Sequence, residues 1–220
     1  MTSTTSTSAS LDMRGKTITT YIAYEAAQRL RTLAEGDTLE LLTGTGDAIG
    51  NDIRAWCHAT GHQLASTASA GTHCRYVIIK GAPQRPGKSL AAVVSDPGLE
   101  ELLSPLGFAL AAALEGVDVS LYFQGPAVRV LATGFTEKLH GWRRPFSRFA
   151  RAGLAKTGHV PAAEKIRQLQ ALGARLYLCG PSMQHFRMKQ ADIAFRDVTI
   201  AEYLTFTEAM TSADIHLFVQ

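Results

Sequence analysis

Among the three cysteines of the chain, Cys179 has the surroundings that suit a reactive thiol best. It ends an apolar run (176–178) and is followed by a glycine, a proline and a serine (180–182), residue types that turn a chain and open a helix. A thiol just before a helix begins lies beside unpaired backbone N–H groups, which favour its thiolate and make it a nucleophile. The alternative is a small apolar residue that ends a buried strand. The local sequence leaves both interpretations open.

The elements around Cys179 predict a mostly parallel sheet covered by helices on both faces, because apolar strands alternate with helices over the second part of the chain. The predicted strands are 89–94, 117–123, 174–178 and 215–219, and the predicted helices are 99–114, 162–172 and 202–210. Ligands of such sheets bind beyond the carboxyl ends of the strands. We therefore expect a pocket around Cys179 built from residues that follow the strands: Ser95, Asp96, Gln124, Gly125, Gly180, Ser182 and His185.

The first part of the chain predicts a smaller α/β domain with the order βαβαββ, a two-layer sandwich with both helices on one face. The first predicted strand ends at residue 13, and the other three span 38–42, 63–69 and 75–80. The two predicted helices span 19–33 and 47–60. Residues 82–87 are rich in proline and glycine and predict a linker. Residues 1–10 are almost entirely serine and threonine and predict a disordered tail rather than a signal peptide.

Composition limits the classes of function. The net charge of +3 is too small to indicate nucleic-acid binding by itself, and an odd number of cysteines, three, does not form a disulfide framework. No uncharged apolar run is long enough for a membrane span. We expect a cytoplasmic protein.

Residues 11–81 resemble the TusA/SirA family of small sulfur carriers. The resemblance rests on Leu11-Asp-Met-Arg-Gly15, Gly36-Asp-Thr-Leu39, Asp52-Ile-Arg-Ala-Trp-Cys-His-Ala-Thr-Gly-His62 and Tyr76 to Lys80. The family carries sulfur on a cysteine of a Cys-Pro-x-Pro motif, but Ile18 stands at that position here, with Thr19 and Tyr21 in place of the prolines. Because isoleucine cannot carry a persulfide, the resemblance implies an inactive domain retained for docking, assembly or stability.

Residues 88–220 are similar to the DsrE-like family, which includes sulfurtransferase subunits and peroxiredoxin-like proteins. The matching segments are Leu172-Gly-Ala-Arg-Leu-Tyr-Leu-Cys-Gly-Pro-Ser-Met183, Thr199-Ile-Ala-Glu-Tyr-Leu204 and Ala213-Asp-Ile-His-Leu-Phe-Val219. In that family the cysteine at the position of Cys179 accepts and passes sulfane sulfur. The resemblance also implies a homo-oligomer, trimeric or hexameric in relatives, with sulfur donors and acceptors as partners. Fusions of the two domain types occur in this group.

Two other groups of residues could form functional sites. Cys57, His58, His62, His73 and Cys74 are zinc-ligand types, but they lack a Cys-x-x-Cys pair, so a metal site is not expected. Residues 138–156 mix arginine and lysine with Trp142, Phe146 and Phe149, a mixture that could bind single-stranded nucleic acid, a membrane surface or an anionic partner. We favour a solvated flap over the pocket, or an oligomer contact, with the aromatic side chains packed inward. Such a cationic flap could steer anionic sulfur species towards Cys179.

The residues around Cys179 and these resemblances thus predict a sulfur-relay protein, a candidate sulfurtransferase, that carries a persulfide on Cys179. Sulfane-sulfur transfer of this kind needs neither a metal nor a cofactor. The alternative is a non-catalytic scaffold or ligand-binding protein with a buried Cys179.

Overall fold

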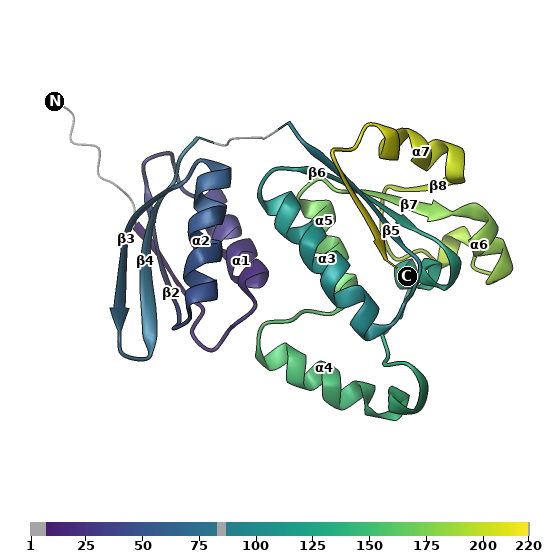
Figure 1. Cartoon of the computed structure of the whole chain (residues 1–220), viewed down its shortest axis with the longest axis horizontal. Helices are drawn as coiled ribbons and strands as arrows, with labels where there is room; N and C mark the ends of the chain where they lie inside the picture. Colours follow the sequence, from purple (N-terminus) through teal and green to yellow (C-terminus); the bar gives the residue numbers. More distant parts are fainter. Residues whose placement is uncertain (1–7, 83–86, 220) are drawn as a thin grey trace. The chain divides into compact units, whose positions relative to one another are not determined.

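The computed structural model describes residues 8–82 and 87–219. The chain divides into two compact units, formed mainly by the residues before and after this gap. Each contains one sheet and its own helices (Figure 1). The predicted two-domain α/β fold class is confirmed. Residues 1–7 of the expected tail and 83–86 of the expected linker lie outside the described residues.

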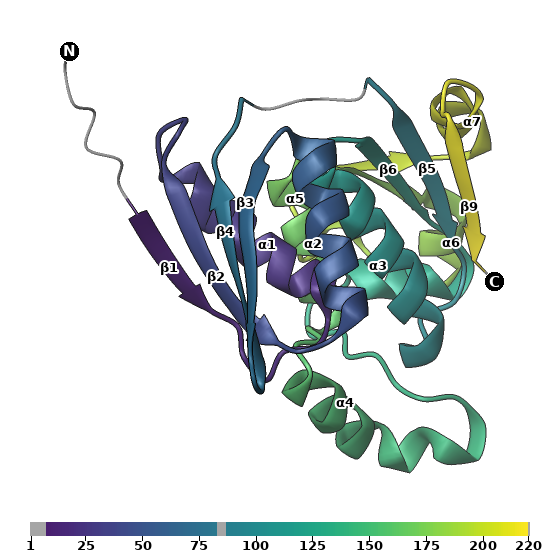
Figure 2. The same ribbon diagram turned by 60° about the vertical axis from the view of Figure 1, so that its left-hand side comes forward.

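The first unit has the predicted order βαβαββ. Its elements are β1 (Ser8–Asp12), α1 (Thr19–Arg31), β2 (Thr38–Gly44), α2 (Asp47–Thr60), β3 (Gln63–Ala70) and β4 (His73–Ile79). The strands form a mixed sheet in the order β1-β2-β4-β3, in which β1 and β2 are parallel and the other pairs are antiparallel. Figure 2 shows α1 and α2 on one face of this sheet.

Side-chain spacing explains this arrangement. On α1, Ile22, Ala26 and Leu30 recur every four residues and are buried, so they form one apolar face of the helix. On β2, the buried residues Leu39 and Leu41 alternate with less buried ones, so they point to one face of the sheet. Helix α2 ends where Gly61 adopts a left-handed φ of 78°, a conformation that suits glycine.

One expectation for this unit needs correction. Residues 8–10, predicted to lie in the disordered tail, belong to β1, which pairs in parallel with residues 38–42 of β2. Serine and alanine contribute little apolar surface, but their backbone N–H and C=O groups pair with the neighbouring strand whatever the side chain.

The second unit is built on a five-stranded sheet with the order β8-β7-β6-β5-β9, in which every neighbouring pair is parallel. Its strands are β5 (Ser89–Val94), β6 (Asp118–Phe123), β7 (Arg175–Cys179), β8 (Val198–Ala201) and β9 (Ile215–Val219). Residues 90–94 and 119–123 are buried without alternation, because helices cover both faces of the sheet. Figures 1 and 2 show α3 (Leu99–Leu114) and α5 (Ala162–Ala171) on one face, and α6 (Gly180–His185) and α7 (Tyr203–Thr211) on the other.

Four further helices of this half of the chain lie in its connections. They are η1 (Gly125–Leu131), η2 (Gly141–Phe146), α4 (Ser147–Lys156) and η3 (Gln190–Asp192). Strand β8 and helix α4 were not predicted from the sequence. None of the helices in the described residues is long and apolar enough to cross a membrane.

Candidate functional site

Cys179 is the last residue of β7, a strand held between β6 and β8 in the sheet. Cys179 keeps an extended conformation as the residue just before the short helix α6, and Pro181 lies in the first turn of that helix, as the sequence predicts. The residue is only 1% exposed. Its thiol therefore lies at the carboxyl edge of the parallel sheet, beneath the elements that follow the strands.

Ser182 fixes one side of the sulfur. Its hydroxyl donates a hydrogen bond to Cys179 Sγ at 3.0 Å and accepts one from the backbone N–H of Gly125 at 2.9 Å. Because the oxygen of Ser182 receives the N–H of Gly125, the hydroxyl hydrogen is free to point at the sulfur. A donor held in this way stabilises negative charge that develops on sulfur.

The turns after β5 and β6 are joined by a second link. Gln124 Nε2 donates to Ser95 Oγ at 3.1 Å, next to Gly125, whose φ of 52° lies in the left-handed region. The structure therefore joins four of the predicted pocket residues pairwise, Ser95 with Gln124 and Gly125 with Ser182, and the second pair includes the partner of Cys179.

Tyr122 is a neighbour of Cys179 that sequence reasoning missed. It is 1% exposed and stacks on Phe206 of α7, with ring centroids 4.8 Å apart. Burial, and then the nearby Cys179 thiol, raise the pKa of the Tyr122 phenol. Among the described residues its hydroxyl makes no hydrogen bond of normal geometry. A buried hydroxyl without a normal hydrogen bond is rare, and this one lies close to the Cys179 thiol.

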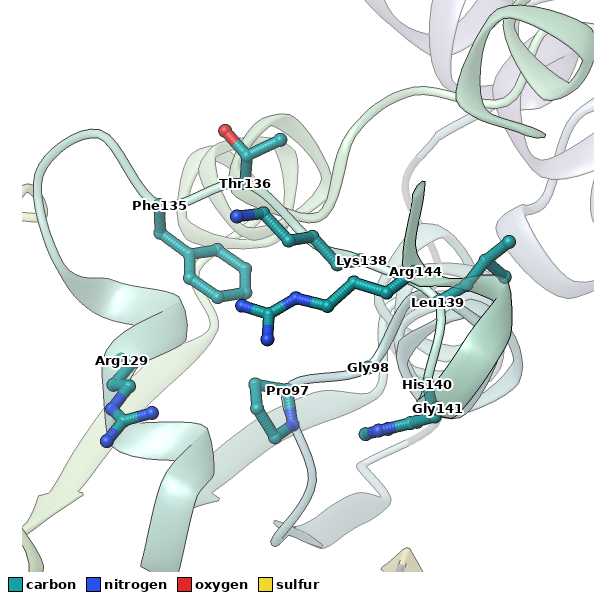
Figure 3. A pocket seen from close by; sticks show the side chains of 10 residues that line it. All are labelled: Pro97, Gly98, Arg129, Phe135, Thr136, Lys138, Leu139, His140, Gly141 and Arg144. Carbon is teal, nitrogen blue, oxygen red and sulfur yellow. The ribbon is translucent and has the colours of Figure 1, made fainter. Parts of the chain in front are cut away.

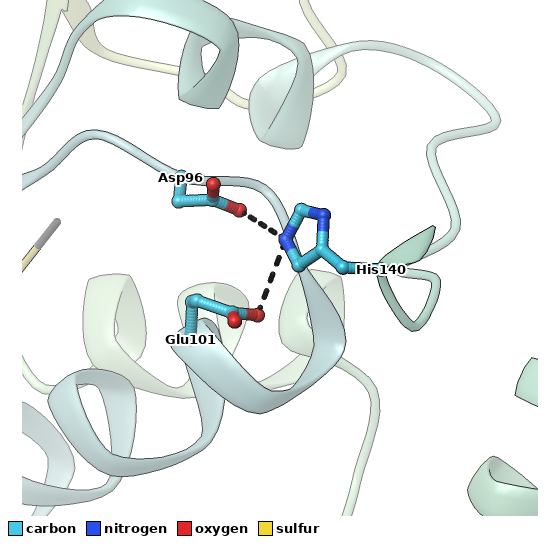
Figure 4. A group of neighbouring side chains, drawn as sticks. All are labelled: Asp96, Glu101 and His140. Atoms are coloured by element: carbon cyan, nitrogen blue, oxygen red, sulfur yellow. Dashed lines mark hydrogen bonds and ion pairs between the residues drawn. The ribbon is translucent and has the colours of Figure 1, made fainter. Parts of the chain in front are cut away.

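Asp96 does not join Cys179. Its carboxylate accepts from the backbone N–H of Gly98 at 2.7 Å and contacts His140 Nε2 at 2.8 Å, and Glu101 Oε2 lies 3.3 Å from the same nitrogen (Figure 4). One ligand atom from each of Asp96, Glu101 and His140 lies within 4.8 Å of the others, so these are residues that could hold a metal ion. They already bond to one another, and the group serves here to attach the segment around His140 to the start of α3.

Two other predicted pocket residues do not line the thiol by any described contact. His185 is exposed, and its ring packs edge-on against Phe186, with centroids 4.8 Å apart. Gly180 faces β8, since a Cβ on it would meet Ile200 at 3.6 Å. Both residues follow Cys179 in the chain, but helix α6 carries the His185 side chain outward.

Cys57 and His62, two of the zinc-ligand types of the first unit, make separate local contacts. Cys57 is buried in α2, and burial raises its pKa to about 12. His62 accepts from the Gly81 N–H through Nδ1 at 3.1 Å and packs edge-on against Trp56. Within the described residues, the Asp96 group is the one set of three or more such side chains close enough to share a metal ion.

The basic and aromatic segment contributes to a separate cavity of about 410 Å³ beside the loop after β5 (Figure 3). Its lining residues are Pro97, Gly98, Arg129, Phe135, Thr136, Lys138, Leu139, His140, Gly141 and Arg144. The expectation that Trp142, Phe146 and Phe149 pack inward is wrong, because these side chains are between 54% and 82% exposed. The segment is thus an ordered wall of a cavity that also presents aromatic side chains to solvent.

The fold and the thiol at the sheet edge agree with the comparison to protein families. The DsrE/DsrF-like family matches residues 88–219. The chain belongs to the DsrE/DsrF-like family. This family is linked to sulfur relay. We call residues 87–219 the DsrE-like unit below.

Comparison with solved structures finds the crystal structure of the YchN protein from E. coli. It is 17% identical in sequence and covers 60% of this chain and 97% of its own, with a TM-score of 0.44. None of the curated proteins compared shows significant similarity to this chain.

Proposed function

We propose that this protein is a sulfur-relay protein that carries sulfane sulfur as a persulfide on Cys179. The observation that carries the proposal is the thiol at the carboxyl edge of the parallel sheet, with a serine hydroxyl aimed at it from 3.0 Å. Membership in a family linked to sulfur relay supports the same chemistry.

The transfer is an exchange at sulfur. The Cys179 thiolate attacks the terminal sulfur of a donor persulfide, a new S–S bond forms at Cys179, and the donor's S–S bond breaks. The electron pair of the broken bond leaves with the donor thiolate, so no oxidant, reductant or cofactor takes part. In the second half-reaction an acceptor thiolate attacks the terminal sulfur on Cys179 in the same way, and Cys179 leaves as a thiolate.

Ser182 and Tyr122 have distinct roles in this proposal. Ser182 donates to Sγ and thereby stabilises the thiolate both before attack and when it leaves. The unpartnered hydroxyl of Tyr122 is a donor for the charge on the terminal sulfur of the persulfide. Ser95 and Gln124 act on the turns that hold these groups rather than on sulfur.

A second function is favoured by one observation, the 1% exposure of Cys179. A donor must reach the sulfur through a local opening of the turns or of α6. If no such opening occurs, Cys179 is a core residue and the protein is a non-catalytic scaffold or ligand-binding protein.

We also propose that residues 11–81 form a TusA-like domain without sulfur-carrying activity, joined through residues 82–87 to a DsrE-like domain at 88–220. The element order βαβαββ and the location of Ile18 directly before α1 support this assignment. Ile18 occupies the place of the carrier cysteine, so the domain would act in docking or assembly.

Exposed apolar side chains of the second unit suggest how the protein assembles. Large apolar side chains on β8, α7 and β9 are 41% to 89% exposed: Ile200, Tyr203, Leu204, Ile215 and Phe218. Exposed apolar surface of this kind supports a homo-oligomer, which light scattering after size-exclusion chromatography would measure. We propose a cytoplasmic location, with sulfur donor and acceptor proteins or small sulfane-sulfur species as partners.

The test is mass spectrometry of the intact protein after incubation with a small-molecule persulfide or with thiosulfate. The wild type should gain roughly 32 Da, the mass of one sulfur atom, and a reductant should remove it. The gain should be absent from Cys179→Ser and unchanged in Cys57→Ser, because the Cys57 thiol is buried with its pKa raised to about 12.

The Ser182→Ala variant keeps the Cys179 thiol but removes the hydroxyl that donates a hydrogen bond to it. Loss of a hydrogen bond to a charged group should slow persulfide formation about tenfold without abolishing it. If wild type and Cys179→Ser gain the same mass, or neither gains any with either donor, the relay proposal is wrong and the scaffold function replaces it.

A further inference from the structure

The cavity beside the loop after β5 is lined by basic side chains and no acidic one. Arg129 comes from η1, Lys138 and His140 come from the segment after it, and Arg144 comes from η2. Figure 3 shows the Arg144 guanidinium extending between Phe135 and Pro97, with the Lys138 side chain alongside it. Two guanidinium groups and one lysine amine therefore border one cavity.

Within the part of the chain that the structure describes, Arg129, Lys138 and Arg144 have no acidic partner. Arg143 pairs with Glu100 and Arg167 with Glu164, and Arg151 donates to the Glu137 carbonyl at 2.6 Å. By contrast, no ion pair or side-chain hydrogen bond in the described residues involves the charged groups of Arg129, Lys138 or Arg144. Arg129 is held by stacking, since its Cζ lies 4.3 Å from the centre of the Phe186 ring. Like charges gathered without a counter-charge repel one another, and an anion between them removes that cost.

His140 differs from the other three because its ring nitrogen already has acidic partners. Asp96 and Glu101 contact its Nε2, so this nitrogen holds the wall of the cavity and is not available to a ligand. An anion in the cavity would therefore depend on Arg129, Lys138 and Arg144.

The wall that carries Lys138 and Arg144 is held by hydrogen bonds. The backbone N–H of Leu99 donates to the Lys138 carbonyl at 2.9 Å. Ser147 accepts from the Leu139 N–H at 2.9 Å and donates to the Arg144 carbonyl at 2.6 Å. The basic side chains thus project from a backbone that is ordered before any ligand arrives, which lowers the entropic cost of binding.

We propose that this cavity binds a small oxyanion that carries an apolar group, such as a phosphate monoester or a sulfonate. Arginine pairs two N–H groups with two oxygens of a tetrahedral anion, and lysine adds a mobile point charge. The volume of about 410 Å³ falls in the range of small-molecule sites and exceeds what one phosphate fills. Phe135 and Pro97 supply apolar surface for the remainder of the ligand.

The site is independent of the proposed persulfide chemistry, since Cys179 is not among its lining residues. Binding is tested by isothermal titration of the full chain at low salt with inorganic phosphate, phenyl phosphate, benzenesulfonate and thiosulfate. Phenyl phosphate should bind tighter than inorganic phosphate, and high salt should weaken both because the cations are near the surface. The Cys179→Ser variant should bind like the wild type.

Matched variants locate the site. Arg144→Gln and Lys138→Gln should each weaken phenyl phosphate binding about tenfold, the effect of one lost charge-assisted hydrogen bond. Arg148→Gln removes the same charge from an exposed position outside the cavity and should leave binding unchanged. The proposal is overturned if none of the four probes binds, or if Arg148→Gln weakens binding as much as Arg144→Gln. Thiosulfate bound in preference to phenyl phosphate would also contradict the apolar part of the assignment.

Discussion

Lys165 gives the most quantitative prediction because it is a buried cation with little compensation. It lies on α5 with 4% exposure, and its Nζ donates to the Leu103 carbonyl at 3.4 Å. Burial lowers the Lys165 pKa from 10.5 to about 8, although the nearby Glu137 carboxylate raises it. Folding therefore favours the neutral amine over the ammonium ion.

The sign and size of the effect on stability follow from this pKa. Between about pH 8 and 10.5 the unfolded chain holds a proton on Lys165 that the folded chain does not. The free energy of unfolding therefore rises with pH across this window and is lowest below it. A pKa change from 10.5 to about 8 corresponds to about 3 kcal/mol.

Lys165→Met removes the titrating group and keeps a side chain of similar length. Urea denaturation at several pH values from 7.5 to 10.5 should show the wild type gaining about 3 kcal/mol of stability relative to the variant. Lys156→Met, at an exposed position, should follow the wild type. Parallel curves for the wild type and Lys165→Met, or a wild type that loses stability relative to it, would refute the reasoning.

Three further substitutions test other parts of the structure. Tyr122→Phe removes a buried hydroxyl without a partner, so denaturation should show stability unchanged or raised by up to about 1 kcal/mol, while sulfur transfer measured by mass spectrometry slows. Gly98→Ala places a Cβ 2.1 Å from His140 Nε2, which should break the bonds of His140 and speed hydrogen exchange over residues 138–144. Gly81→Ala places a Cβ 1.8 Å from the Gly61 carbonyl oxygen and should lower stability by about 1–3 kcal/mol in urea denaturation.

Controls make these outcomes decisive. Gly107→Ala serves both glycine variants, since a Cβ there meets nothing within 4 Å, and it should not reduce stability. Wild-type exchange rates in Gly98→Ala, or wild-type stability in Gly81→Ala, would show that the neighbouring atoms move aside without cost. A loss of more than about 1 kcal/mol in Tyr122→Phe would show that the hydroxyl is bonded in the folded protein.

The strands and helices that contain long apolar runs can be predicted from the sequence. The bounds of β5 and α3 are predicted to the residue, because continuous apolar stretches lie between polar turns. Strand β8 escaped prediction because it has four residues and is mostly not buried, so its place in the sheet depends on pairing with β7. Helix α4 escaped because Ser147 is its one buried residue, which leaves no apolar stripe to recognise.

Some contacts of the site can be predicted from the sequence and others cannot. The links of Gly125 to Ser182 and of Gln124 to Ser95 follow from a rule, because parallel strands end at one edge. Asp96 obeys the rule in sequence but bonds to His140, which lies 44 residues later. No spacing pattern in one sequence predicts such a contact.

The pairing of β9 with β5 has a consequence for how the chain folds as it is made. The Ser89 N–H donates to Asp214 at 2.8 Å, a contact that spans 125 residues, and the two strands then pair in parallel. Strand β5 therefore cannot pair with β9 until residues 215–219 have been synthesised. Until then the apolar edge of β5 stays exposed. Such long-range closure folds slowly, so the nascent DsrE-like unit should be a client for chaperones until its last strand emerges.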